Sequence, residues 1–177
     1  MLRKFGILFA VLTTLAGCMG SPEPQLGPDG RPLPQVYRIP NTNRVQYQML
    51  DSVNLLREAA GLPAVELNSE LNAAAATHAQ DMHIQNRPWH FGSDGSSPID
   101  RVARSGYAGI MLGENISETY ETELETLAAW MDDEGTRYVL LHPEATDMGF
   151  SWFQESNGKI WWTLLMGGRT VATAPDV

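Results

Sequence analysis

Four histidines carry most of the chain's capacity for acid–base chemistry or metal binding. His78 and His83 are five residues apart, which places them about 140° apart around a helix. They therefore cannot ligate one metal as the paired histidines of a zincin helix do. His90 lies between Trp89 and Phe91, ahead of a run of Gly, Ser and Asp. Its setting allows two interpretations: a histidine whose hydrogen bonds order the loop, or a ligand within a cleft.

Nucleophilic catalysis has little support in the sequence. There is no Gly-x-Ser-x-Gly elbow, and the single cysteine, Cys18, belongs to the N-terminal segment. Glu114 lies in a Gly-Glu-Asn sequence, where it either contacts a ligand or accepts hydrogen bonds from the amides of a turn. His78 shares an apolar stripe with Leu71 and Met82, which favours a half-buried structural histidine.

The N-terminus has the pattern of an export signal. Arg3 and Lys4 precede an uncharged apolar run over residues 5–15, too short to span a bilayer, and Leu-Ala-Gly-Cys follows, ending at Cys18. This pattern is typical of a signal peptide over residues 1–17, cleaved before a cysteine that carries lipid. We expect Cys18 to attach the chain to a membrane, and Met19 in place of Asp implies the outer membrane. The alternative is an ordinary secretory peptide with an incidental cysteine.

Charge and composition limit the partners. The net charge of −9 becomes −11 when Arg3 and Lys4 leave with the signal peptide, so the chain repels phosphate backbones and we expect no nucleic-acid partner. Residues 18–42 are rich in proline and predict an extended tether. With Cys18 modified no disulfide is possible, so residues 43–172 form one domain that its core alone must hold together.

Four helices are predicted from apolar spacing and capping residues. The first has Val45, Met49, Val53 and Leu56 in register and stops near Gly61, and the second runs from the N-cap Asn68 to about Asn86. A third starts at Ser97-Pro98 and closes at Gly106. Thr122 and Glu125 form a possible capping box for the fourth, with four residues directed toward the core: Leu124, Leu127, Ala128 and Met131.

The end of the chain changes to a two-residue period. Residues 148–152 and 160–164 alternate as strands do, and Asn157-Gly158 between them predicts a hairpin with a type I′ turn. Trp161 and Leu165 make the second face of the last strand apolar, so helices must cover both faces. The expected fold is α+β, a three-layer α-β-α sandwich with a central antiparallel sheet covered by helices on both faces.

Four segments together resemble bacterial members of the CAP superfamily, which comprises cysteine-rich secretory proteins, antigen 5 and pathogenesis-related proteins. Any one of them is weak evidence, but their order and spacing cover nearly all of residues 43–167, and the family's α-β-α fold agrees with the sandwich predicted above. The segments are Leu71–Met82; Trp89-His90 with Asp94-Gly95 and Arg101; Gly106-Tyr107 with Gly113-Glu114-Asn115-Ile116; and Trp130-Met131 with Gly135, Arg137, Leu141, Pro143 and Met148-Gly149.

The resemblance implies a cleft with two histidines and two carboxylates, a set that suits a divalent metal such as zinc. His90 matches the first histidine, Glu114 the first carboxylate and Asp133 the second carboxylate. Thr136 stands where the second histidine is expected, and a threonine hydroxyl is a poor zinc ligand. The set is therefore incomplete and its metal affinity weakened, unless the loop of His142 folds back into the cleft.

Three functions follow from the resemblance. The first is a non-catalytic binding module, tethered to the cell envelope, whose cleft holds a small or elongated ligand; eukaryotic relatives bind sterols and other lipids, so the expected ligand is a lipid or another apolar molecule. The second is a metal-assisted hydrolase or peptidase with His90, Glu114 and Asp133 as ligands and a bound water as nucleophile. The third is a structural envelope protein with a vestigial cleft.

Overall fold

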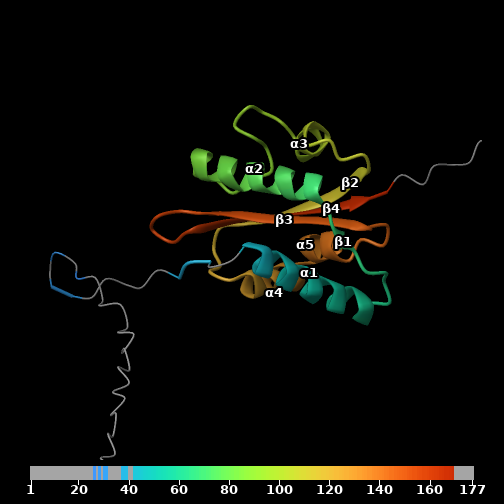
Figure 1. The fold of residues 1–177 in the computed structure, drawn as a ribbon, viewed down its shortest axis with the longest axis horizontal. Helices are drawn as coiled ribbons and strands as arrows, with labels where there is room; N and C mark the ends of the chain where they lie inside the picture. The colour runs from blue at the N-terminus through green and yellow to red at the C-terminus, as the bar shows by residue number, and fades with distance from the viewer. Residues whose placement is uncertain (1–25, 27, 29, 32–36, 40–41, 170–177) are drawn as a thin grey trace, which may run out of the picture. The chain divides into compact units, whose positions relative to one another are not determined.

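The computed structural model describes residues 26, 28, 30–31, 37–39 and 42–169 (Figure 1). The chain divides into two units, residues 1–35 and 36–177. The predicted signal peptide, Cys18 and most of the proline-rich tether lie outside the described residues. Among the helices that are described, none combines the length and apolarity that crossing a bilayer requires.

Five helices and four strands make up the described part of the second unit. α2 and α3 lie on one face of the sheet, and α1, α4 and α5 lie on the other (Figure 1). This arrangement confirms the three-layer sandwich. The elements are α1 Thr42–Ala59, β1 Glu66–Leu67, α2 Ser69–Gln85, α3 Pro98–Arg104, β2 Ile110–Ser117, α4 Glu123–Asp132, α5 Glu134–Leu140, β3 Asp147–Gln154 and β4 Ile160–Gly168.

The sheet has the strand order β1-β3-β4-β2. β4 pairs antiparallel with both β3 and β2, and the two-residue β1 adds a parallel edge beside β3. β4 is therefore an interior strand, and all nine of its residues are buried. Its side chains alternate between two cores: Trp162 and Leu164 pack with α1, α4 and α5, while Trp161 and Leu165 pack with α2. Both tryptophans are core residues, as the sequence favoured.

Glycine at position 149 allows α2 to lie directly on β3. A Cβ added at Gly149 would lie 2.3 Å from the carbonyl carbon of Leu71, a distance that no side chain can occupy. The predicted N-cap Asn68 starts α2 by accepting a hydrogen bond from the Leu71 amide at 2.9 Å. Asn72, one residue further on, accepts from the Phe150 amide at 2.7 Å. These contacts fix where α2 crosses the sheet.

The hairpin between β3 and β4 was predicted correctly, but its turn type was wrong. Gly158 has a positive φ of 102°, whereas Asn157 does not adopt the left-handed conformation that a type I′ turn requires. The loop spans residues 155–159, and the Gly158 amide donates to the Glu155 carbonyl at 3.0 Å. Asn157 instead accepts from the Lys159 amide through its side chain at 2.9 Å. A longer loop therefore replaces the two-residue turn.

Several polar elements differ from the sequence-based expectation. α5 begins with Glu134 and Gly135 and shows no long apolar stripe, so periodicity does not reveal it. β2 carries the Gly-Glu-Asn sequence for which a turn was expected, and it contains a bulge between Met111 and Gly113. In α4, Leu124 and Ala128 are exposed, and the predicted core positions are taken partly by Thr126 and Trp130. α5 and β2 carry polar residues at several positions, so a search for apolar periodicity does not detect them.

Arg57 of α1 is a fully buried cation that contacts main-chain oxygens. Its Nε donates to the Pro63 carbonyl at 2.9 Å, and Nη1 donates to Leu140 at 2.9 Å and to His142 at 3.0 Å. Nη2 donates to Ala145 at 3.1 Å. Burial lowers the pKa of the Arg57 guanidinium, which nevertheless stays charged at neutral pH. The Arg57 side chain thus connects α1 to the end of α5 and to the loop that leads into β3.

Replacing Arg57 should test this link. In Arg57→Met, four carbonyl groups lose their donor, and the bonds to Leu140 and Ala145 are buried, so we expect the free energy of unfolding to fall by at least about 3 kcal/mol. Urea denaturation followed by tryptophan fluorescence measures the change. Arg104→Met, at an exposed arginine of α3, is the matched control and should change stability little. Equal stability for the two variants would show that the Arg57 contacts are not needed.

Candidate functional site

His90 and Glu114 come together at the edge of the sheet, although 24 positions separate them in the chain. His90 lies in the loop after α2, and Glu114 lies on β2. The His90 Nδ1 atom is 2.8 Å from Glu114 Oε1. Because a carboxylate only accepts hydrogen bonds, Nδ1 is the donor in this contact. The His90 side chain is 52% exposed, so the rest of its ring is open to solvent.

Arg101 of α3 pairs with the same carboxylate from inside the protein. Its Nη2 atom donates to Glu114 Oε2 at 2.7 Å, and the two side chains are 5% and 1% exposed. Its Nη1 atom donates to the carbonyls of His90 at 2.9 Å and Ser96 at 3.2 Å. The predicted capping box of α3, formed by Ser97 and Asp100, holds the helix that presents Arg101. Sequence reasoning placed Arg101 only in a family motif and missed it as a site residue.

His78 completes the buried side of this network. It is fully buried on α2, and not half-buried as the sequence favoured. Its Nε2 atom donates to the Trp89 carbonyl at 3.0 Å and lies 3.7 Å from Glu114 Oε1. Burial lowers the pKa of His78, and this effect outweighs the opposite effect of the Glu114 charge. His78 is therefore neutral, and its Nδ1 has no partner among the described residues.

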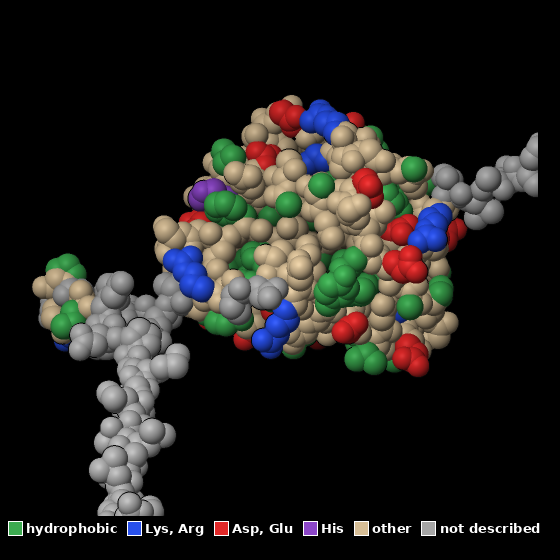
Figure 2. Space-filling model, in the orientation of Figure 1, with side chains coloured by type: hydrophobic (Ala, Val, Ile, Leu, Met, Phe, Trp, Pro, Cys, Tyr) green, Lys and Arg blue, Asp and Glu red, His purple; other side chains and the backbone are tan. Residues whose placement is uncertain are grey.

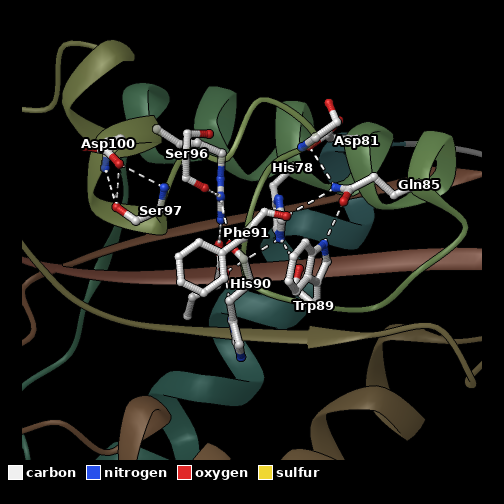
Figure 3. A network of polar contacts seen from close by, with 12 residues as sticks. His78, Asp81, Gln85, Trp89, His90, Phe91, Ser96, Ser97 and Asp100 are labelled. Atoms are coloured by element: carbon white, nitrogen blue, oxygen red, sulfur yellow. Dashed lines mark hydrogen bonds and ion pairs between the residues drawn. The ribbon is translucent and has the colours of Figure 1, made fainter.

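Interior side chains hold three successive carbonyls of the histidine loop (Figure 3). His78 binds the carbonyl of Trp89, Arg101 binds that of His90, and Gln85 binds that of Phe91 at 3.2 Å. The side chains of His90 and Phe91 project outward from this fixed backbone (Figure 3). Both interpretations of His90 thus have a physical basis, since the residue is exposed and its loop is ordered by hydrogen bonds.

The structure places Asp133 and Thr136 together, but apart from His90 and Glu114. Asp133 is the N-cap of α5 and accepts from the Thr136 amide at 2.9 Å. That hydrogen bond is the main cause of the lowered pKa of Asp133. The Thr136 hydroxyl donates to the Trp130 carbonyl at 2.7 Å. Among the described residues no hydrogen bond or ion pair joins either of them to His90 or Glu114, although the Thr136 carbonyl accepts from Asn115, the residue after Glu114, at 2.8 Å.

His142 does not complete the set either. Its ring lies edge-on to Tyr138, with ring centroids 5.3 Å apart, and its Nδ1 accepts from the Glu144 amide at 3.3 Å. Within residues 42–169 no contact links His142 to His90 or Glu114. The loop after α5 therefore does not bring a second histidine to the first one.

The donors around Glu114 do not fit a divalent cation. Nowhere among the described residues do three or more His, Cys, Asp or Glu side chains form a group that could hold a metal ion. Both carboxylate oxygens of Glu114 already have partners, His90 on one and Arg101 on the other. A cation bound here would also meet the Arg101 guanidinium at close range. The arrangement therefore favours a neutralised structural carboxylate over a metal ligand.

Comparison with known proteins identifies the family of this domain. The family model for the cysteine-rich secretory protein family, CAP, matches residues 50–166. The chain therefore belongs to the CAP family, as the motifs around His90, Glu114 and Trp130 predicted.

Two curated relatives are from Bacillus subtilis. The uncharacterized protein YkwD is 29% identical over 120 residues, which cover 68% of this chain and 46% of YkwD. The uncharacterized membrane protein YlbC is 29% identical over 102 residues, which cover 58% of this chain and 30% of YlbC. This chain thus matches less than half of the length of either relative.

Solved structures share the fold at low sequence identity. An outer surface protein of Borrelia burgdorferi matches with a TM-score of 0.68 at 15% identity, covering 77% of this chain and 100% of that one. An extracellular protein with an SCP domain from Bacillus anthracis matches with a TM-score of 0.64 at 23% identity, covering 76% of this chain and 46% of that one. These likenesses establish the three-layer fold.

The pairing of Glu114 with Arg101 can be tested by removing one charge. In Glu114→Gln the guanidinium stays buried without a counter-charge, so we expect the free energy of unfolding to fall by about 3–5 kcal/mol. Asp94→Asn, which removes one carboxylate from the exposed Asp94–Arg104 pair, is the control and should have little effect. Chemical denaturation of both variants decides the matter. If Glu114→Gln is as stable as the control, the buried pair does not stabilise the fold.

Proposed function

We propose that this CAP-family chain is an exported, membrane-tethered binding module without catalytic activity, and that its ligand is an uncharged lipid or another apolar molecule. The observation that carries the ligand class is an apolar groove between α1 and α4. The absence of catalysis rests on the engaged state of the Glu114 carboxylate. The tether rests on the N-terminal sequence together with the relatives' locations.

The state of Glu114 argues against catalysis at the histidine loop. A general base or a metal ligand must be reachable by its partner, whereas the Glu114 side chain is only 1% exposed and is hydrogen-bonded to Arg101 through one oxygen and to His90 through the other. The His90 ring is exposed, but none of its described contacts is with a serine, threonine or cysteine nucleophile. These features support binding over bond breaking in this part of the domain.

The groove between α1 and α4 has the size and lining of a site for an apolar ligand. Its volume is about 490 Å³, within the usual range for small-molecule pockets. Leu55 is 66% exposed and Leu124 43% exposed, so two large apolar side chains face solvent from neighbouring helices. The groove is lined by Ser52, Leu55, Leu56, Leu124, Leu127, Ala128, Met131 and Asp132.

The charge near the groove favours an uncharged lipid over an anionic one. Asp132 lies on its rim, and the chain as a whole is acidic. A free fatty acid would bring a second negative charge to this rim, whereas an acylglycerol or a sterol would not. The proposal therefore keeps the apolar ligand expected from the family resemblance. It places that ligand in the α1–α4 groove, which includes Asp132 next to the predicted cleft residue Asp133, and not at His90 and Glu114.

The distribution of surface charge does not favour binding to a polyanion such as a nucleic acid. On the face seen in Figure 2, basic side chains are scattered among acidic and apolar ones and form no continuous patch. The net charge of −9 adds a general repulsion of nucleic acids. We therefore include the absence of a nucleic-acid partner in the proposal.

Substitutions in the groove should weaken lipid binding. Leu124→Gln and Leu55→Gln each remove apolar area that a bound ligand would cover, and burying one leucine contributes about 1.5–3 kcal/mol, so each should weaken binding about tenfold or more. Titration with a fluorescently labelled monoacylglycerol measures the affinity. Ile99→Gln removes an equally exposed apolar side chain, 66% exposed, outside the groove, and should leave the affinity unchanged.

Two results would contradict this proposal. The first is equal affinity in the groove variants and in Ile99→Gln, which would move the ligand elsewhere. The second is no saturable binding of labelled monoacylglycerol, of a sterol or of free fatty acid by the unmodified protein. That result would favour the structural envelope protein, the third function considered from the sequence.

Export and membrane attachment have support from the relatives as well as from the sequence. One structural relative is named an outer surface protein, another an extracellular protein, and one curated relative a membrane protein. The signal-like residues 1–17 precede Cys18, which lies outside the described residues. We infer that lipid on Cys18 anchors the chain to the outer membrane, where it faces the periplasm or the cell surface.

Replacing the cysteine tests the anchor directly. In the unmodified chain we expect the mature N-terminus to be an acylated Cys18, and the protein to sediment with membranes. Cys18→Ala has no thiol to carry lipid, so the protein should lack the acyl mass. It should appear either in the soluble fraction or as the uncleaved precursor. Mass spectrometry and cell fractionation provide the readouts. A cleaved, soluble protein without an acyl group would instead support the ordinary secretory peptide.

A further inference from the structure

The side chains that line the groove between α1 and α4 offer a ligand hydrogen-bond acceptors but no donor. Two of the lining residues carry a side-chain oxygen, Ser52 of α1 and Asp132 of α4, and the others are aliphatic or methionine. We propose that the groove selects lipids with a free hydroxyl group, and that this hydroxyl donates a hydrogen bond to the Asp132 carboxylate. The inference rests on the proposed function, and it names the class of uncharged lipid that the groove binds.

Asp132 is an exposed carboxylate whose oxygens are available to a ligand. Within the described part of the chain, no hydrogen bond or ion pair engages its side chain, whereas the neighbouring Asp133 already accepts from the Thr136 amide at 2.9 Å. Asp132 is also the last residue of α4, where a negative charge gains nothing from the helix dipole. Hydrogen bonds to a charged group are stronger than those between neutral groups, so a ligand that donates here gains affinity.

Ser52 is the other polar side chain of the lining, and its hydrogen is already used. Its Oγ donates to the Gln48 carbonyl, one turn earlier in α1, at 2.8 Å. Toward the groove, Ser52 therefore has only lone pairs to offer. The thioether sulfur of Met131 is likewise no more than a weak acceptor. No lining side chain can thus donate to a carbonyl or ether oxygen of a ligand.

A lipid without a donor does not match these acceptors. When a ligand covers the lining, the oxygens that lose water need a new donor, and a missing one costs affinity. A fully esterified or etherified lipid has only acceptors of its own, so it would bring lone pairs against the lone pairs of Ser52 and Asp132. A monoacylglycerol or a free sterol supplies the hydrogen that the groove lacks.

The order of residues along α4 suits an amphiphile. Leu124, Leu127, Ala128 and Met131 follow each other at helical spacing and form an apolar strip, which Asp132 ends. The eight residues from Leu124 to Asp132 span about 12 Å of helix. A lipid that lays its tail along the strip therefore brings its polar head group to the carboxylate.

Among donors, a hydroxyl suits this groove better than an ammonium group. An ammonium has three N–H donors, whereas the lining offers it the oxygens of two side chains. Burying a charge against leucine side chains also costs far more than burying a hydroxyl. Because Asp132 is exposed, water and salt weaken its attraction for a cation. A hydroxyl needs one acceptor, and Asp132 provides it.

Two ligands that differ in their donors test the inference. The full chain, loaded with the labelled monoacylglycerol, is competed with 1-monooctanoylglycerol and with its 2,3-di-O-methyl ether, each below its critical micelle concentration. The ether is the more apolar molecule, so the hydrophobic effect alone would make it the tighter ligand. We expect the opposite order, with the ether about tenfold weaker, because it cannot donate to Asp132.

Two aspartate variants separate direct contact from long-range charge. Asp132→Asn keeps the shape of the side chain and adds an amide donor for an ether oxygen, so the difference between the two ligands should shrink to about twofold or less. Asp51→Asn removes the same charge from α1, at an exposed position next to Ser52 that does not line the groove, and should keep the full difference. Both positions are exposed, so both variants should fold.

Four results would overturn the inference. Equal affinity of the unmodified chain for the monoacylglycerol and its ether shows that the hydroxyl is not recognised, although lipid binding itself still supports the proposed function. An unchanged difference in Asp132→Asn, or an equal loss in Asp51→Asn, removes the contact with Asp132. Tighter binding of octylamine than of 1-monooctanoylglycerol identifies a cationic ligand instead. No binding of the labelled monoacylglycerol overturns the proposed function together with this inference.

Discussion

The complete burial of β4 determines the rest of this structure. Trp161 and Trp162 are adjacent in the chain, point to opposite faces and are both fully buried. A strand with large apolar side chains on both faces is stable only when helices cover the sheet on both sides. The three layers follow, with α2 and α3 on one face and α1, α4 and α5 on the other. The proposed lipid groove lies within the second of these helical layers, between α1 and α4.

The polar network around Glu114 is a consequence of the same burial. Glu114 pairs with Leu165 of β4, so its position on β2 is enclosed once α2 covers the sheet. A carboxylate in that position needs a partner, and Arg101 supplies it from α3. The same arginine fixes the carbonyl of His90, so one ion pair closes the interior and orders the exposed loop. The histidine loop is thus first a product of folding, and its outward side chains are what remains available for binding.

Sequence patterns predicted the apolar layers and the capped helix starts well, and predicted the polar interior poorly. Alternation identified β3 and β4, and the caps Asn68 and Ser97 identified α2 and α3, because these signals are local. β2 was missed, since Gly-Glu-Asn resembles a turn until partners from α2 and α3 enclose it. The same limit applies to Asp133, whose role as the N-cap of α5 was not predicted. Which polar residues are buried depends on tertiary partners, and spacing along the chain does not reveal them.

The residues around Glu114 fit a metal ion poorly, and Arg101 contributes more to this poor fit than Thr136 does. The sequence pointed to Thr136, because a threonine stands where a second histidine is expected. In the structure, Thr136 bonds to Trp130 and Asp133 at the start of α5, and none of its described hydrogen bonds is with Glu114. Even with a histidine at position 136, the Glu114 carboxylate would still be hydrogen-bonded to the Arg101 guanidinium and the His90 imidazole. Arg101 supplies the charge that a metal ion would otherwise bring, so the Glu114 carboxylate is neutralised without a metal.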